Sequence, residues 1–240
     1  MVIKVFLEDM TAGSRALMIF FALTKIKASG FKIDLKGDRY PDEYLEICPE
    51  KNHIPLMREN DLIMSDPIQI MKHLLKRHKP SPNNQFYPFN NILERLEVDK
   101  VHKLYRTLIS KKIPKIHKKL KSPFSQFTAS KLVHFSLDDV SKIKTFLVDF
   151  EQLFLKSGGL YDQTGGACYL VDKGLVTIVD IFIFCDIMQF MLVGVDVFGF
   201  GRLGRWLNGL LKHEIFVRVH TKLLLFAQTT GRKRGYKFEI

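Results

Sequence analysis

Cysteine is scarce in this sequence, and the three that occur lie far apart. Cys48, Cys168 and Cys185 are odd in number, form no CxxC pair and have no histidine at the spacing of a metal ligand. A disulfide-stapled scaffold and a zinc site are therefore not expected. We predict a protein of a reducing compartment, the cytoplasm, that carries no metal.

Long uninterrupted apolar runs are also missing. The most apolar region, 169–200, is broken by five charged residues: Asp172, Lys173, Asp180, Asp186 and Asp196. No uncharged stretch of about 18 residues is therefore available to cross a bilayer, and we interpret the region as a buried core helix. The first ten residues carry a lysine and two acids and lack the apolar run of a signal peptide. We predict neither a transmembrane segment nor secretion.

Several catalytic motifs do not occur. GxSxG, HExxH, the P-loop and a GxGxxG that follows a predicted strand are absent. This argues against the hydrolase, metalloprotease, nucleotide-hydrolysing and dinucleotide sites that depend on them. A reactive site must therefore be found from the arrangement of the whole chain.

Positive charge is in excess, with a formal net charge of +12. Much of it lies in one stretch and in the tail: Lys111, Lys112, Lys115, Lys118, Lys119, Lys121, Arg232, Lys233, Arg234 and Lys237. Such a run is ordinarily a solvated helix face, and the alternative is attraction to nucleic acid or a membrane surface. Because no aromatic residues alternate with these lysines, we predict no nucleic-acid partner.

The first 80 residues alternate between strand and helix patterns. The predicted order is strand 2–7, a helix from 11 to about 30, strand 31–35, helix 41–47, a hairpin of 54–57 and 62–64 with its turn at 58–61, and a helix up to 78. A helix between the first two strands makes them parallel. Asp66 and Pro67 mark the last helix start, as N-cap and first helical residue.

Helical periodicity dominates the rest of the chain. A segment rich in proline and polar residues at 79–85 has the composition of a linker. The helices predicted beyond it are 89–121 with a kink near Pro114, 136–156, 177–194, 202–213 and 214–229. Thr177 and Asp180 form a capping-box pattern. We predict a βαβαββα domain at 1–79, a linker at 80–88 and an all-helical domain at 89–240.

Several local patterns fall in the order found in cytosolic glutathione transferases. They are VFLEDMTAGSRAL, Lys36-Gly37, His53-Ile-Pro55-Leu, LIMSDPIQI, Phe86-Tyr-Pro88, LERLEVDKVHKLY, Thr177-Ile-Val-Asp180 and Leu203-x-x-Trp206. The chain resembles the theta-like branch of that family over nearly its whole length. The resemblance implies a thioredoxin-like α/β N-terminal domain followed by an all-α C-terminal domain.

The resemblance places Thr11 where theta-like enzymes have a serine that stabilises the glutathione thiolate. Threonine keeps the hydroxyl and adds a methyl group. The alternative interpretation is that Thr11 only caps the following helix. Ser14 is a second hydroxyl nearby, and Arg15 matches a family arginine that could add positive potential, or else a surface ion pair.

Other residues are implied to hold the tripeptide. Pro55 matches a proline that follows a cis bond, which presents the backbone of Ile54 to the cysteinyl part of glutathione. Asp66 would bind the γ-glutamyl amine. In the family a serine follows it and donates to the γ-glutamyl carboxylate, whereas Pro67 can donate nothing there. Each lost bond costs about 1.5–3 kcal/mol unless the N–H groups of Ile68 and Gln69 substitute.

Arg39 and His53 lie near family positions that face the glycyl carboxylate, and both are equally well interpreted as surface residues. Cys48 follows a short helix, and we interpret it as a small packed residue rather than as a nucleophile. The implied function is a detoxifying glutathione transferase: a homodimer that uses glutathione as co-substrate and binds a hydrophobic electrophile beside the helix that starts near Asn90. The alternative is a non-catalytic binding or assembly module of the same fold.

Overall fold

The computed structural model describes residues 2–35, 37–78, 86–121, 135–155, 169–171 and 175–233. Its elements are β1 (Ile3–Leu7), α1 (Ala12–Thr24), β2 (Ser29–Lys32), α2 (Asp42–Ile47), β3 (Leu56–Glu59), β4 (Leu62–Met64), α3 (Pro67–His78), α4 (Ile92–Lys112), α5 (Pro114–Lys121), α6 (Leu137–Phe154), α8 (Ile178–Met188), η1 (Gln189–Val193), α9 (Gly201–Leu211) and α10 (Glu214–Lys233). Cys168, residues 79–85 of the predicted linker and the tail beyond 233 lie outside the described residues.

Four strands form one mixed sheet in the order β2-β1-β3-β4. β1 is parallel to β2 and antiparallel to β3, and β3 is antiparallel to β4, as the predicted βαβ unit and hairpin require. The predicted bounds of the second strand were wrong, because β2 begins at Ser29 and ends at Lys32. It pairs with Lys4 to Leu7 of β1, and the partner strand ends there.

The hairpin turn is also tighter than its polar sequence suggests. Glu59 belongs to β3 rather than to the turn, which leaves Asn60 and Asp61 to reverse the chain. The Glu59 carboxylate is buried and pairs with His73 at 2.6 Å and Arg77 at 2.9 Å, both on α3. Burial alone would raise the pKa of Glu59, but the hydrogen bond from His73 and the charge of Arg77 hold this pKa below its usual value. A charged residue can therefore occupy a strand.

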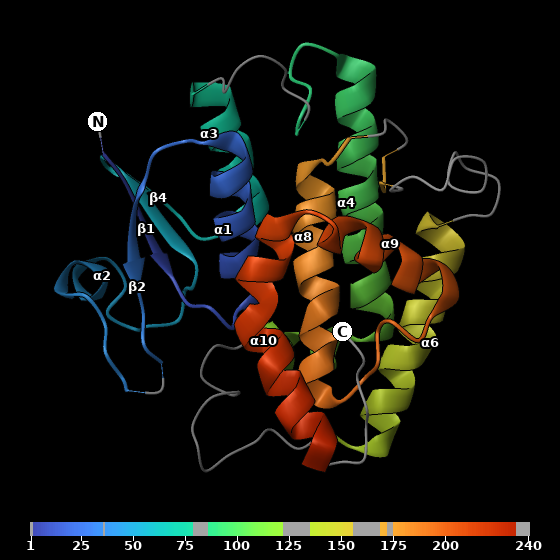
Figure 1. The fold of residues 1–240 in the computed structure, drawn as a ribbon. Helices are drawn as coiled ribbons and strands as arrows, with labels where there is room; N and C mark the ends of the chain where they lie inside the picture. Colours follow the sequence, from blue (N-terminus) through green and yellow to red (C-terminus); the bar gives the residue numbers. More distant parts are fainter. Residues whose placement is uncertain are drawn as a thin grey trace.

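The two faces of the sheet are covered by different helices. Ile3 and Val5 of β1 point to the core shared with α1 and α3, whereas Phe6 and Leu56 belong to a smaller cluster that Tyr44 of α2 completes. This alternation follows from the two-residue period of a strand. In Figure 1 the sheet lies at one side of the molecule, with α1 and α3 between it and the other helices.

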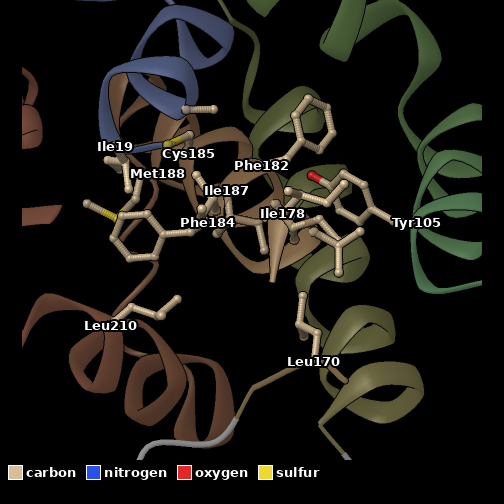
Figure 2. Packing of buried hydrophobic residues seen from close by; sticks show 14 of the residues in the cluster. Ile19, Tyr105, Leu170, Ile178, Phe182, Phe184, Cys185, Ile187, Met188 and Leu210 are labelled. Carbon is tan, nitrogen blue, oxygen red and sulfur yellow. The ribbon is translucent and has the colours of Figure 1, made fainter. Parts of the chain in front are cut away.

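Helix α8 lies at the centre of the helical part, and every one of its residues is buried. It packs against α1, α3 and α4. Figure 2 shows Tyr105 of α4 beside Phe182, while Ile19 of α1 lies beside Met188 on the other side. One apolar core therefore extends from the sheet through α1 to the helices. The division into two domains at 80–88 stays a prediction.

Two predicted helices are each interrupted. Instead of a kink near Pro114, the chain leaves the helix at Ile113 and starts α5 at Pro114, because proline cannot donate the N–H that would continue α4. The helix predicted over 177–194 changes into the 3₁₀ helix η1 at Gln189. Its start is as predicted, with the Thr177–Asp180 capping box formed.

The lysines from Lys111 to Lys119 lie on a solvated helix face, which is the first of the two interpretations of the charge pattern. On α5 the side chains of Lys115 and Lys118 are exposed, whereas Ile116 and Leu120 are buried. Among the helices of the described ranges, none has both the length and the apolar character to cross a membrane.

Candidate functional site

A pocket of about 290 Å³ lies where the sheet-bearing part of the chain meets α5 and α8. It is formed by the start of α1, the loop before β3, the start of α3 and one face of the helical part. The residues that line it are Thr11, Ala12, Gly13, Asn52, His53, Ile54, Pro55, Ser65, Asp66, Pro67, Leu120, Phe182, Asp186 and Gln189. Of the predicted site residues, Thr11, His53, Ile54, Asp66 and Pro67 are thus brought together.

Thr11 stands at the N-cap of α1, but its side chain caps nothing. Its hydroxyl oxygen instead lies 2.7 Å from the Ser14 hydroxyl and 3.2 Å from the Glu8 carbonyl. The Ser14 hydroxyl in turn accepts the Glu8 N–H at 3.0 Å. The predicted alternative, in which Thr11 serves as a side-chain cap, is therefore not what the structure shows, and Thr11 is one of the residues that line the pocket.

Gly13 lets the first turn of α1 approach two proline rings. A Cβ atom at this position would lie 2.8 Å from Pro55 Cδ and 2.8 Å from Pro67 Cγ. Real Cβ atoms do not come so close to ring carbons, so any larger residue would push the three segments apart. Glycine thus keeps the three segments in contact around the pocket.

The Ile54–Pro55 bond is cis, as the resemblance implied. Ile54 lines the pocket directly before β3, which pairs with β1 and so places this loop beside the start of α1. The His53 side chain is exposed, and its carbonyl accepts the Tyr44 hydroxyl at 3.1 Å. The loop is therefore held from both sides, by the sheet and by α2.

The start of α3 offers one acceptor group and one free donor. The Asp66 carboxylate accepts the Gln69 N–H at 3.0 Å, and Pro67 has no N–H. The Ile68 N–H is the remaining donor at this helix start, and the described part of the chain provides no acceptor for it. Arg106 of α4 lies 3.9 Å from the Asp66 carboxylate, and because both side chains are about half exposed, the attraction is weak.

Arg39 and Cys48 are not among the pocket residues. Arg39 is exposed and pairs its backbone with Asp34 in the loop after β2, so its predicted contact with a ligand stays a prediction. Cys48 ends α2, is buried and lies 3.4 Å from the Asn52 side chain. Both cysteines of the described residues are free thiols, and burial raises the pKa of Cys185 to about 12. Both thiols are buried, which disfavours a role as a reactive nucleophile.

Arg15 is fully buried, and the suggestion of a surface ion pair was wrong. Its guanidinium donates to the carbonyls of Met10 at 2.7 Å and Cys185 at 3.2 Å, and to the Gln189 side-chain oxygen at 2.5 Å. All of these acceptors are neutral, and burial lowers the pKa of the guanidinium. A buried cation without a carboxylate in contact favours anions in its vicinity. Gln189, which it holds, lines the pocket.

The helical wall of the pocket is more polar than the sequence predicted. Asp186 of α8 lines it beside Phe182, and its carboxylate accepts the Tyr105 hydroxyl at 2.9 Å and lies 2.8 Å from His117 Nε2. Burial, reinforced by Asp186, raises the pKa of Tyr105 far above its usual value. The available signal was a carboxylate inside an apolar run, which must find partners if it is buried.

The helix that starts near Asn90 was expected to line the electrophile pocket, and that placement stays a prediction. No residue of α4, which begins at Ile92 just after Asn90, lines this pocket, and its helical wall comes from α5, α8 and η1 instead. Packing against α8 turns the buried side of α4, with Val98 and Tyr105, toward the core. Within the ranges that the structure describes, no group of three or more histidine, cysteine or acidic side chains could hold a metal ion.

The sequence matches no protein-family model, and a comparison with curated proteins finds no relative. Solved structures do match. Human glutathione transferase theta-2, in complex with glutathione, aligns with a TM-score of 0.69 and 21% identity over 96% of this chain and 91% of that chain. Glutathione transferase E6 from Drosophila melanogaster aligns with a TM-score of 0.70 and 18% identity over 99% and 100% of the two chains.

A human theta-class enzyme in complex with the glutathione conjugate of 1-menaphthyl sulfate gives a TM-score of 0.69 and 20% identity over 98% and 92%. At these identities the likeness concerns the fold alone. The chain has the glutathione transferase fold, and the predicted combination of a thioredoxin-like sheet region with a helical region is confirmed.

Proposed function

We propose that the protein is a glutathione transferase that binds glutathione in this pocket and transfers its thiolate to a small hydrophobic electrophile. The observation that carries the proposal is the meeting, around one pocket, of Thr11, the cis Ile54–Pro55 bond and Asp66. These three lie far apart in the sequence, and the family resemblance implied a role at one site for each of them. Similar structures that contain glutathione support the choice of ligand.

In this proposal the backbone of Ile54 binds the cysteinyl part of glutathione, and the Thr11 hydroxyl donates a hydrogen bond to the sulfur. A bond to the charged form lowers the pKa of the thiol. The positive end of α1 and the buried Arg15 guanidinium act in the same direction. The thiolate then forms a bond to carbon while the bond from that carbon to its leaving group breaks.

The ends of the tripeptide would be held less firmly. Asp66 would accept the γ-glutamyl amine, and the Ile68 N–H would be the donor for the γ-glutamyl carboxylate in place of the groups that Pro67 lacks. Arg39 and His53 are proposed to face the glycyl carboxylate. The electrophile would contact Leu120 and Phe182 on the opposite wall. We further propose that the protein is a homodimer with a role in detoxification. Because the described thiols are free, we propose that it is cytoplasmic.

Calorimetric titration with glutathione, followed by conjugation assays on a chlorinated aromatic, an alkyl halide and an epoxide, tests the proposal. We expect binding, and we expect Thr11→Ala to lower turnover by about 10–100-fold while affinity changes less. Thr24→Ala is the matched control, because Thr24 is an equally buried hydroxyl at the other end of α1. Absence of binding at millimolar glutathione would contradict the proposal.

Pro67 favours the second candidate, a non-catalytic binding module with the same fold. This alternative predicts that the protein binds glutathione but conjugates none of the three electrophiles. It also predicts that Thr11→Ala leaves the affinity for glutathione unchanged.

A further inference from the structure

Ser14 is a fully buried hydroxyl one turn inside α1, and it does not line the pocket. Its oxygen lies 2.7 Å from the Thr11 oxygen and already accepts the Glu8 N–H. Among the described residues, Thr11 Oγ1 is the one acceptor within reach of the Ser14 proton. The direction of the bond between the two hydroxyls therefore decides whether both hydroxyl protons have acceptors.

Two arrangements are possible. If Thr11 donates to Ser14, the Ser14 proton has no acceptor, which costs about 1–3 kcal/mol for a buried group. If Ser14 donates to Thr11, every proton has an acceptor, because Thr11 can donate to the Glu8 carbonyl at 3.2 Å. Buried hydroxyls rarely stay unsatisfied, so the second arrangement is favoured.

The bond from Thr11 to Glu8 is weak and easily exchanged. At 3.2 Å it is longer than the usual 2.7–2.8 Å between hydroxyl and acceptor oxygens. The Glu8 carbonyl also accepts the Thr11 N–H at 3.3 Å, so it keeps a partner when the Thr11 hydroxyl turns away. A negatively charged acceptor in the pocket can then accept a hydrogen bond from the Thr11 hydroxyl, while the Glu8 carbonyl stays paired.

We propose that Ser14 is a positioning residue, which donates to Thr11 Oγ1 and thereby directs the Thr11 proton to the thiolate in the pocket. The inference rests on the proposed function. A hydroxyl that accepts one hydrogen bond is a better donor of the next, so the Ser14–Thr11 pair stabilises the thiolate more than Thr11 alone does. Ser14 acts through Thr11 and does not touch the substrate.

The test follows the ultraviolet absorbance of the bound thiolate against pH. Ser14→Ala is expected to raise the pKa of bound glutathione by about one unit, and kcat/KM falls about tenfold below that pKa. The dissociation constant for glutathione, measured where the thiol is protonated, changes less than about threefold. Ser14→Cys, which keeps a weaker donor, gives an intermediate pKa and also serves if the alanine variant does not fold.

Two controls separate positioning from a general structural role. Thr24→Ala removes a buried hydroxyl from the same helix, where it donates to the Phe20 carbonyl at 2.8 Å, and leaves the thiol pKa unchanged. In a Thr11→Ala background, Ser14→Ala adds no further rise. An unchanged thiol pKa in Ser14→Ala, or an equal rise with and without Thr11, overturns the inference while the proposed function stands. Failure of the wild-type protein to bind glutathione overturns both.

Discussion

Pro67 occupies a central position at the start of α3. Its ring approaches Gly13 of α1 so closely that the two helices meet there, and it lines the pocket. A proline at the first helical position is favourable for the helix, because an N–H is unpaired there in any case. The same missing N–H removes a donor from the place where a ligand carboxylate is proposed to bind. Helix stability and ligand affinity therefore make opposite demands on this residue.

Pro67→Ser restores both an N–H and a hydroxyl at that place. We expect glutathione to bind at least about tenfold more tightly in isothermal titration, because each bond to a charged group contributes about 1.5–3 kcal/mol. Pro114→Ser is the control, since Pro114 holds the same first position in α5 and does not line the pocket. Equal affinity in wild type and Pro67→Ser would show that the γ-glutamyl carboxylate does not bind at α3.

At the scale of elements, the capping box of α8 connects the central helix to the chain before it. The Asp180 carboxylate accepts the N–H of Thr177 at 2.9 Å and that of Leu170 at 2.7 Å, and it is fully buried. Burial raises the pKa of Asp180 to about 6, although these bonds oppose the shift. The box thus positions the helix that carries Phe182 and Asp186 into the pocket.

Asp180→Ala leaves two buried N–H groups without acceptors. We expect a loss of about 2–4 kcal/mol in the free energy of unfolding, measured in urea through the fluorescence of the buried Trp206. Asp139→Ala is the matched control, because Asp139 completes an exposed capping box on α6 and should cost about 1 kcal/mol or less. Equal losses in the two variants would contradict a special role for the buried box.

The pH dependence of this loss has a definite sign. The folded-state pKa of Asp180, about 6, lies above the model-peptide value of 3.8, so the folded protein binds this proton more tightly than the unfolded chain. The contribution of Asp180 to stability is therefore greatest below pH 3.8 and declines as the pH rises to about 6, by about 3 kcal/mol. The difference between the wild-type and Asp180→Ala profiles should show this decline.

At the scale of the whole molecule, the main apolar core runs from the sheet to the helices, and two groups of neighbouring apolar side chains stand out among those that are exposed. They are Leu62 and Ile63 on the edge strand β4, and Ile92, Leu93 and Leu96 on the first turns of α4. We propose that the homodimer has a twofold interface, which joins the sheet region of one copy to the helical region of the other and covers both groups.

A charge in either part should therefore break the dimer. Leu93→Glu and Ile63→Glu are expected to give monomers in light scattering at micromolar concentration, because each places a charge in the proposed interface. Leu93 is 75% exposed in the single chain, and the control Leu137→Glu alters a residue of α6 that is 90% exposed. A monomeric wild-type protein, or dissociation by the Leu137 variant alone, would rule out this interface.

Much of the fold was predictable because its signals are local. Asp66 and Pro67 start α3 through bonds that lie within four residues, and the Thr177–Asp180 box does the same for α8. Element order followed from periodicity, and the family resemblance of the segment around Pro55 implied the cis bond. Such features depend on neighbours along the chain, so their residue types are enough to reveal them.

The remaining features depend on residues far apart along the chain. The buried Glu59 carboxylate is paired in its strand by His73 and Arg77 of α3, and Arg15 is buried because α1 packs on α8, 170 residues further on. Asp186 reached the pocket wall through partners on α4 and α5. Burial and pairing of charge are properties of the packed molecule. Sequence pattern therefore predicted the elements, the family resemblance predicted pocket residues at the starts of α1 and α3 and before β3, and packing decided which residues form the opposite wall.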